Sequence, residues 1–389
     1  MPVRRTQVIK AIPQIVQKGL RGGVAYYDGQ FDDSRLAVNL MQTSIEQGAT
    51  LVNYATVTSL LKNDGKVSGV VVRDETDGHT FNLKGQCIVN ATGIFVDQII
   101  QMDNREETPI VRPSQGIHLV VDRSFLGGDD AFMIPKTSDG RVLFGIPWRN
   151  RLILGTTDTP VNECVQEPRP LQEEIDFVME TSAAYLTRPL QREDVLCVYA
   201  GLRPLAAPKR NKDKKKTKEI SRRHKLFVST SGLITITGGK WTTYRQMAQE
   251  TVDLCIKKCG FPPRKCVTKN LKIHGYKQTA DYGNQRHVYG SDEEKIRALQ
   301  NEKPEYAEKL HPSYDFTVAE VVWAVREEMA VTVDDVLSRR VRALILDARA
   351  AMVMAPVVAR IMARELDRNK EWEAYQVAEF KQLASGYII

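Results

Sequence analysis

The sequence predicts a mixed α/β protein that ends in a helical region. Short β-rich runs and a helical pattern alternate over residues 23–100, and residues 110–240 are mostly β-rich with Gly and Pro at the turns. After Trp241 the pattern becomes helical. The 389 residues, 42% of them hydrophobic, suffice for two or three domains. We expect a boundary near residue 260, dividing the chain into regions 1–260 and 261–389.

The first elements are a short strand at 23–27 and an amphipathic helix. Asp32 or Asp33 is suited to cap the helix, and Gly48 ends it. Four apolar residues at helical spacing are expected to form its buried face: Leu36, Leu40, Met41 and Ile45. Further short strands are expected at 50–53, 56–61, 67–72, 80–83 and 87–90, with hairpin turns at 63–65 and 77–78.

The middle of the chain reads as a β-rich region with one helix at 171–185. Its strands are expected at 117–122, 141–147, 152–155, 195–201, 226–229 and 233–237. Helices then follow at 242–259, 293–300, 318–328, 333–336, 342–364 and 370–383. This order of elements justifies the α/β class with a helical C-terminal region.

The basic character of the chain is local. Lys plus Arg number 55 against 48 Asp plus Glu, for a net charge of +7. Residues 209–218 hold seven basic residues and one acidic one, which is +6 of that total. Because this stretch has no aromatic residues to stack on bases, it is most simply a solvated loop, and no nucleic-acid partner is expected.

The sequence shows no membrane span, no secretory signal and no metal-binding motif. No run approaches the roughly 20 apolar residues that span a bilayer, and residues 1–10 lack the apolar stretch of a secretory signal. Six Cys in a chain of this size indicate a reducing, cytoplasmic location. Cys255, Cys259, Cys266 and His274 do not have the spacing of a zinc site, so no metal is expected.

An apolar strand ends in the small residues Asn90, Ala91, Thr92 and Gly93 before a helix begins. Such an end lets a cofactor come close and directs helix N–H groups at an anion. A tight turn between strand and helix, without any ligand, explains the same residues.

A second strand leads into Gly238, Gly239, Lys240, Trp241 and Thr242. The P-loop pattern G-x-x-x-x-G-K-[ST] is not met here, since Thr follows the Ile-Thr-Ile run where a Gly is required and Trp follows the Lys. Two glycines and helix N–H groups beside a cation remain, which suit a phosphate or an electron-rich ring edge. A close-packed turn with a solvated Lys is the alternative.

Three cationic residues lie in β-rich surroundings. His118 alternates with apolar neighbours, which is typical of a histidine satisfied within a core. Arg203 lies between Gly, Leu and Pro in a stiff segment, where its planar fork suits a carboxylate or phosphate. Arg222 belongs to the same class of candidates.

Six segments occur in the order seen in FAD-dependent glycerol-3-phosphate dehydrogenases. They are residues 26–33, 90–93, 145–148, 155–158, 201–205 and 238–245. The sequence strongly resembles that family from about residue 19 to residue 245, and residues 328–340 resemble its C-terminal domain.

The resemblance implies a glutathione-reductase-like FAD domain interleaved with a β-rich substrate domain and followed by a helical domain. It also implies oxidation of sn-glycerol 3-phosphate to dihydroxyacetone phosphate by hydride transfer to the flavin, with electrons passing to membrane quinone. Some similar proteins are oxidases that pass electrons to oxygen and release hydrogen peroxide, and no residue decides between the two. A quinone acceptor would imply peripheral association with the inner face of the cytoplasmic membrane.

The resemblance also assigns roles to individual residues. Arg203 and Arg222 resemble ligands of the substrate phosphate. His118 resembles an active-site histidine and is the expected proton acceptor for the C2 hydroxyl. Lys240 belongs to the Gly-Gly-Lys motif close to the flavin.

Further positions are expected to touch the cofactor. Thr157 and Asp158 are expected to shape the site, and Val57 aligns with the strand that holds the adenine side. Residues 90–93 align with the strand end near the pyrophosphate, and residues 238–242 with the segment beside the flavin.

The family's G-x-G-x-x-G turn and the acidic residue that follows it are missing from this chain. Gly19, Gly22 and Gly23 do not fit the spacing. We therefore expect an incomplete FAD domain, a polypeptide that lacks its N-terminal cofactor segment, and an isolated chain that binds FAD poorly or not at all and is inactive. A function of another class, binding of nucleic acid or anionic membrane by residues 209–218, would be lost on deleting that stretch.

Overall fold

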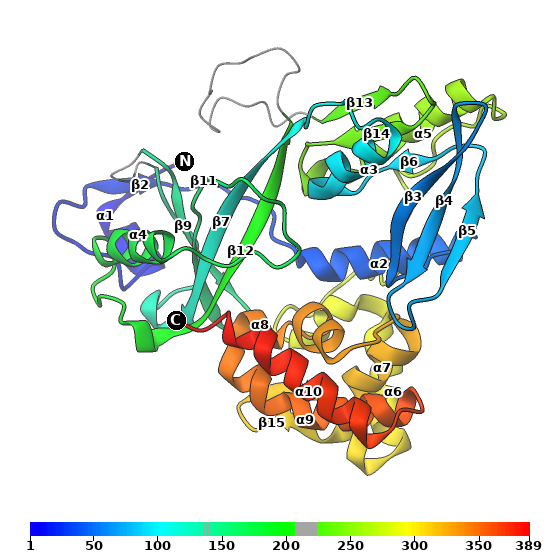
Figure 1. Ribbon diagram of the computed structural model, residues 1–389. Helices are drawn as coiled ribbons and strands as arrows, with labels where there is room; N and C mark the ends of the chain where they lie inside the picture. Colours follow the sequence, from blue (N-terminus) through cyan, green and yellow to red (C-terminus); the bar gives the residue numbers. More distant parts are fainter. Residues whose placement is uncertain (136, 138–139, 207–223) are drawn as a thin grey trace.

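The computed structural model describes residues 1–135, 137, 140–206 and 224–389 (Figure 1). A six-stranded sheet with short helices lies beside a smaller α/β unit, and a bundle of helices packs under both. The expected class, mixed α/β with a helical C-terminal region, is confirmed.

The six-stranded sheet is built on two long antiparallel strands, β7 and β12. The strand order is β8-β9-β10-β7-β12, and β11 pairs with β7 farther along the strand. Their bounds are β7 Val111–Asp122, β8 Phe132–Ile134, β9 Leu143–Trp148, β10 Arg151–Gly155, β11 Thr159–Pro160 and β12 Val195–Ala206.

Alternate residues of β7 face different cores, as the period of two in a strand requires. Ile117, Leu119 and Val121 pack in one core with α4 (Gln172–Ala183) and the N-terminal segment that follows α1 (Arg5–Ala11). Val120 packs on the other side with the C-terminal helices. The sheet therefore joins two hydrophobic cores.

The C-terminal region is helical and has an Ala-rich centre. Its helices are α6 Glu293–Glu302, α7 Val318–Glu327, α8 Ala343–Leu346, α9 Ala348–Glu365 and α10 Lys370–Ser385. It also contains the strand pair β15 Lys309–His311 and β16 Tyr314–Thr317 and one π-helical segment, Asp335–Arg340. Within the described residues, no helix is long and apolar enough to cross a membrane.

A smaller sheet has the order β13-β14-β6, with β6 and β14 parallel. The strands are β6 Val89–Asn90, β13 Lys225–Val228 and β14 Ile234–Thr237, and the helices α3 Val96–Asp103 and α5 Tyr244–Cys259 follow β6 and β14. An antiparallel meander extends from this unit: β3 Ala55–Asn63, β4 Lys66–Asp74 and β5 Thr80–Lys84. The hairpins predicted there are present.

Several predicted strands are wrong or too long. The strand expected at 87–90 is limited to β6 Val89–Asn90. Residues 50–53 form no strand, and the side chains of Leu51 and Val52 are 38% and 63% exposed. The strand expected at 23–27 is β2 Gly22–Val24, which forms a two-stranded sheet with β1 Pro2–Arg4. Strand formation requires a neighbouring strand to pair with, and β-rich composition alone does not supply one.

Helix α2 (Asp33–Glu46) begins as expected, because the Asp32 carboxylate accepts the Arg35 N–H at 3.0 Å. The predicted apolar face is wrong. The buried residues are Arg35, Val38, Asn39, Gln42 and Thr43, while Ile45 is 47% exposed. This helix packs against polar groups of the C-terminal region, so its buried face is polar.

The helix predicted over 342–364 is interrupted. Arg342 has a left-handed φ of 68°, and Asp347 ends α8 and caps α9 by accepting the Ala350 N–H at 2.9 Å. An Asp side chain that bonds its own backbone competes with helix continuation, which explains the break.

Candidate functional site

A cationic side chain lies over one face of the β7–β12 pair. Arg203 on β12 faces Ser114 on β7 in register, and its guanidinium extends over Gly116. Arg203 Nη1 donates to the Thr157 carbonyl at 3.2 Å, and Nη2 donates to Thr156 Oγ1 at 3.0 Å. The guanidinium is thus held in a fixed orientation, which suits bidentate recognition of an oxyanion.

The carboxylate of Asp158 lies beside this guanidinium. Its Oδ1 is 3.7 Å from Arg203 Nη1 and accepts a hydrogen bond from Ser114 Oγ. About 30% of the Arg203 side chain remains exposed, so the cation can be reached from solvent. Thr157 and Asp158, expected to shape the site, therefore lie at Arg203.

His118 lies on the same face, directly opposite Tyr199 in the strand register. The two rings stack with centroids 5.1 Å apart and planes 22° apart. Burial, together with the charge of Arg203, lowers the pKa of His118 to about 4. The ring is therefore neutral at neutral pH and able to accept a proton.

Two glycines face one another between these side chains. Gly116 and Gly201 pair in register, two residues along the strands from the His118–Tyr199 pair and two residues from the Ser114–Arg203 pair. A Cβ built on Gly201 meets no atom within 4 Å. We call this surface, with His118, Tyr199 and Arg203 around the glycines, the Gly116–Gly201 face. The Arg203 guanidinium covers Gly116, and the open space over Gly201 beside it leaves room for a flat group to approach.

The two predicted glycine turns lie side by side at the edge of the smaller sheet. β6 and β14 are parallel neighbours, so the turns at 90–93 and 238–240 follow adjacent carboxyl ends (Figure 1). Gly93, Gly238 and Gly239 have positive φ of 62°, 74° and 78°. Ligands of open α/β sheets bind at such strand ends.

Asn90 fixes the first turn from within. Its side chain is 2% exposed, donates to the Val96 carbonyl at 3.0 Å and accepts from Thr92 Oγ1 at 2.8 Å. A Cβ on Gly93 would meet nothing within 4 Å. Open space beside helix N–H groups fits the phosphates and ring of a dinucleotide such as FAD.

The side chains after the second turn are accessible. Lys240, Trp241 and Thr242 are exposed, and Lys240 precedes the helical turn that opens α5. Gly239 has a positive φ of 78°, which favours glycine, and a Cβ there would also displace the end of the Met247 side chain, whose Sδ would lie 2.6 Å away. Ala91 and Thr92 in the first turn are exposed as well.

One predicted residue lies away from these surfaces, and another is not among the residues that the structure describes. Val57 lies on β3 of the meander, where it pairs with Val72, in a different sheet from both glycine turns. Arg222 and the basic stretch 209–218 lie outside the described residues. The roles expected for them stay predictions.

Tyr199, Gly116 and Thr156 were not singled out from the sequence as site residues. They reach the site through strand register and through the loop after β10. The alternation of side chains along residues 114–120 and 197–203 shows which residues of one strand share a face of the sheet. It does not show which strand pairs with it or in which register, because pairing depends on residues distant in the sequence.

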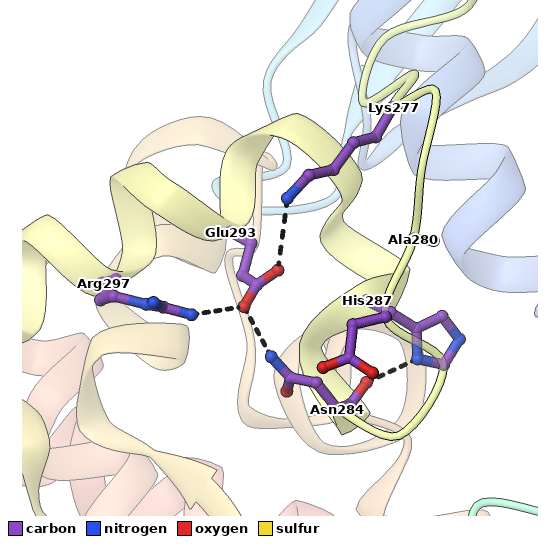
Figure 2. Close-up of a pocket in the computed structure, with 7 residues that line it drawn as sticks. Lys277, Ala280, Asn284, His287, Glu293 and Arg297 are labelled. Atoms are coloured by element: carbon purple, nitrogen blue, oxygen red, sulfur yellow. Dashed lines mark hydrogen bonds and ion pairs between the residues drawn. The ribbon is translucent and has the colours of Figure 1, made fainter.

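A polar pocket of about 180 Å³ lies elsewhere, on the segment 277–297 (Figure 2). Its central carboxylate, Glu293, accepts from Asn284 at 2.6 Å and from Arg297 at 2.8 Å, with Lys277 Nζ at 3.8 Å. Lys277 and Arg297 are therefore both directed at Glu293, and the Asp281 carboxylate, which also lines the pocket, accepts the Gly283 N–H at 3.0 Å. Among the described residues, no group of three or more His, Cys, Asp or Glu is placed to hold a metal ion.

Comparisons with known proteins agree with this architecture. Residues 2–245 match the family described as FAD dependent oxidoreductase, and residues 234–373 match the C-terminal domain of alpha-glycerophosphate oxidase. A solved glycerol-3-phosphate dehydrogenase from Bacillus halodurans, complexed with FAD, superposes with a TM-score of 0.87 at 27% identity, covering 100% of this chain and 80% of that one.

Two relatives are similar in sequence over nearly the whole chain. A probable mitochondrial glycerol-3-phosphate dehydrogenase of Dictyostelium discoideum is 36% identical over 94% of this chain and 61% of its own length. The mitochondrial glycerol-3-phosphate dehydrogenase of Bos taurus is 34% identical over 98% of this chain and 56% of its own length. The chain thus spans somewhat more than half the length of these relatives. The resemblance noted in the sequence is confirmed, and the chain belongs to the FAD dependent oxidoreductase family.

Proposed function

We propose that this chain takes part in the FAD-dependent oxidation of sn-glycerol 3-phosphate to dihydroxyacetone phosphate. The observation that carries the proposal is Arg203, which is oriented by Thr156 and Thr157 beside a neutral His118 on the Gly116–Gly201 face. The names of the relatives support the same substrate.

In this proposal the chain's own residues bind the substrate and move one proton. The Arg203 guanidinium binds the substrate phosphate through two N–H groups, and Arg222 is proposed as a second phosphate ligand. Neutral His118 accepts the proton of the C2 hydroxyl. FAD, when bound, supplies the acceptor for the hydride that leaves C2.

The flavin-side residues follow from the two glycine turns. Residues 90–93 would approach the phosphates of FAD, and Gly238, Gly239 and Thr242 would line the ring side. Lys240 would hold negative charge near the reduced ring. A role of Val57 on the adenine side rests on the resemblance alone.

Direct binding tests this function without requiring turnover. The purified chain is titrated with sn-glycerol 3-phosphate by calorimetry, and with FAD by the change in flavin fluorescence. We expect Arg203→Ala to weaken binding of sn-glycerol 3-phosphate at least tenfold, as expected for loss of a charged hydrogen-bonding partner. The FAD affinity of the isolated chain, which is expected to be low, should be the same in both proteins. Equal affinity of both proteins for the substrate would refute the phosphate role.

The electron acceptor is proposed to be membrane quinone, reached by peripheral association with a bilayer. The alternative is transfer to oxygen, and the match of residues 234–373 to a domain named for alpha-glycerophosphate oxidase is the observation that supports it. With FAD and sn-glycerol 3-phosphate present, hydrogen peroxide release without quinone would support the oxidase. Peroxide-free reduction of a quinone in anionic vesicles would support the dehydrogenase.

A further inference from the structure

A buried carboxylate lies behind the Gly116–Gly201 face, on the other side of the sheet. It has no part in the proposed chemistry. Glu174 on α4 is 3% exposed. It accepts hydrogen bonds from Thr157 Oγ1 at 2.7 Å, Gln115 Nε2 at 2.7 Å and the Leu171 N–H at 3.1 Å. A carboxylate is costly to bury unless donors surround it, and here three donors converge on its two oxygens.

Thr157 connects this carboxylate to the other side of the sheet. Its hydroxyl donates to Glu174 and accepts the Ile117 N–H of β7 at 3.0 Å, so both capacities of the hydroxyl are used. Its carbonyl accepts Arg203 Nη1 at 3.2 Å, and the preceding Thr156 Oγ1 accepts Nη2 at 3.0 Å. The position of Thr157 therefore determines where both guanidinium acceptors lie.

We propose that Glu174 is a positioning residue that, through Thr157, orients the Arg203 guanidinium toward the substrate phosphate. This inference rests on the function proposed above. The carboxylate accepts from Thr157 and Gln115 at the same time, on different oxygens. An amide at this position would direct its NH₂ group at one of these two donors, so Glu174→Gln keeps the size of the side chain but breaks the arrangement.

The test measures ligand affinity in the full chain by calorimetry, with sn-glycerol 3-phosphate and inorganic phosphate as probes. Glu174→Gln is expected to weaken both roughly tenfold, since small displacements of a positioned group cost one to two orders of magnitude. The matched control is Glu173→Gln, which makes the same change at the exposed neighbouring residue and is expected to have no effect.

A second pair of variants separates positioning from general stability. Thr157→Val removes the hydroxyl and is expected to reproduce the loss, whereas Thr157→Ser keeps it and is expected to retain affinity. In an Arg203→Ala background, Glu174→Gln should add no further loss, because its effect passes through Arg203. If Glu174→Gln does not fold, the comparison of Thr157→Val with Thr157→Ser still tests the positioning role.

The outcomes distinguish this inference from the proposed function. If wild type binds neither probe, or if Arg203→Ala binds as well as wild type, the proposed function fails and this inference with it. If Arg203→Ala loses affinity while folded Glu174→Gln and Thr157→Val keep it, only the positioning role is overturned. The positioning role would also be overturned if Glu174→Gln weakened ligand binding in the Arg203→Ala background as much as it does in the wild-type chain.

Discussion

His118 shows how one side chain satisfies both the structural and the chemical interpretation of the sequence. Its ring is half-buried and stacked on Tyr199, as a core histidine would be. Its pKa of about 4, caused by burial and by Arg203, keeps it neutral and able to accept a proton. The same desolvation that holds the ring in place thus keeps it in the form that a proton acceptor needs.

The lowered pKa of His118 predicts a loss of stability in acid. Between about pH 4, the folded pKa, and about pH 6.5, the unfolded one, the unfolded chain binds the extra proton, so stability falls as pH falls. The full shift in pKa corresponds to a change of roughly 3 kcal/mol in the free energy of unfolding. Because the ring is only half-buried, solvent screening makes the expected change smaller than that. Urea unfolding of wild type and His118→Phe across that range measures it. We expect a shallower pH slope for the variant, and parallel slopes would refute this prediction.

Gly116 predicts a second effect at the scale of a residue. In Gly116→Ala the new Cβ would lie 2.2 Å from Arg203 Nη2 and 2.6 Å from Nη1, so the guanidinium must move. We expect weaker calorimetric binding of sn-glycerol 3-phosphate by roughly one to two orders of magnitude.

The facing residue provides a control for folding. A Cβ on Gly201 meets nothing within 4 Å, so Gly201→Ala should change the free energy of unfolding by no more than about 0.5 kcal/mol. Unchanged affinity of a folded Gly116→Ala protein would contradict the placement of Arg203.

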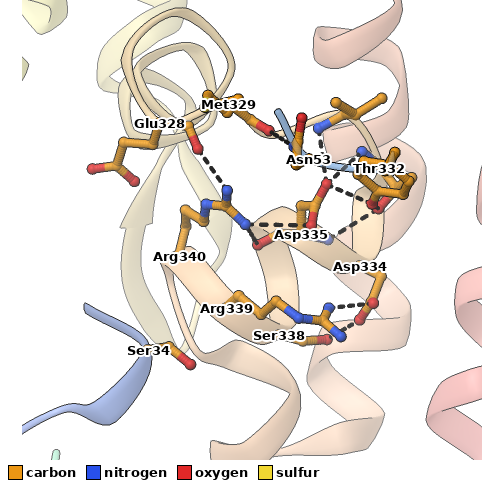
Figure 3. A network of polar contacts seen from close by, with 12 residues as sticks. Ser34, Asn53, Glu328, Met329, Thr332, Asp334, Asp335, Ser338, Arg339 and Arg340 are labelled. Atoms are coloured by element: carbon orange, nitrogen blue, oxygen red, sulfur yellow. Dashed lines mark hydrogen bonds and ion pairs between the residues drawn. The ribbon is translucent and has the colours of Figure 1, made fainter. Parts of the chain in front are cut away.

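Among the elements, α2 departs most from its sequence pattern. Figure 3 shows a polar network of the C-terminal region in which Arg340 contacts Glu328. Arg35 on α2 pairs with Glu328, and their side chains are 5% and 1% exposed. Burial acts to lower the pKa of Arg35, yet the Glu328 carboxylate raises it above its usual value. Arg340 Nη2 also donates to the Glu328 carbonyl at 2.5 Å. Ion pairs of Arg35 with Glu328 and of Asp33 with Arg342 thus connect the helix to the C-terminal region.

Glu328→Gln should therefore destabilise the protein strongly. It leaves the buried Arg35 guanidinium without its counter-charge, for which a loss of about 3–5 kcal/mol is expected in chemical unfolding. The matched control is Glu365→Gln, because Glu365 pairs with the 42% exposed Arg326, where a loss of no more than about 1 kcal/mol is expected. Equal losses in the two variants would show that burial does not determine the strength of the pair.

At the scale of the whole molecule, one histidine joins distant segments. His274 Nδ1 lies 2.6 Å from Glu46 Oε1 at the end of α2, and Nε2 lies 2.5 Å from Asp292 Oδ2 before α6. Lys295 Nζ pairs with the other oxygen of Asp292 at 3.0 Å. Burial acts to lower the pKa of His274, but the two carboxylates raise it overall.

This contact predicts a pH dependence of opposite sign to that of His118. With the folded pKa above the unfolded value of about 6.5, the contribution is full below about pH 6.5 and is lost as pH rises through the folded pKa. His274→Gln should therefore lower stability near pH 6 more than near pH 8, measured by urea unfolding. A loss that is independent of pH would mean that the ring is neutral in the folded protein.

Much of the fold follows from local chemistry. The Asp32 cap, the hairpin at Asp64 and Gly65, and the two glycine turns were predicted because a few adjacent residues decide each of them. The strand at 50–53 and the apolar face of α2 were wrong, because pairing and burial depend on what packs alongside.

The candidate site divides in the same way. Residue type and neighbours singled out His118, Arg203 and Lys240, but nothing local shows that Tyr199 stacks on His118 or that Glu174 holds Thr157. Those contacts arise when β7 and β12, about 80 residues apart, pair in one register and α4 packs behind them. A one-residue slip would turn His118 and Arg203 to opposite faces, so the tertiary structure alone determines which side chains meet.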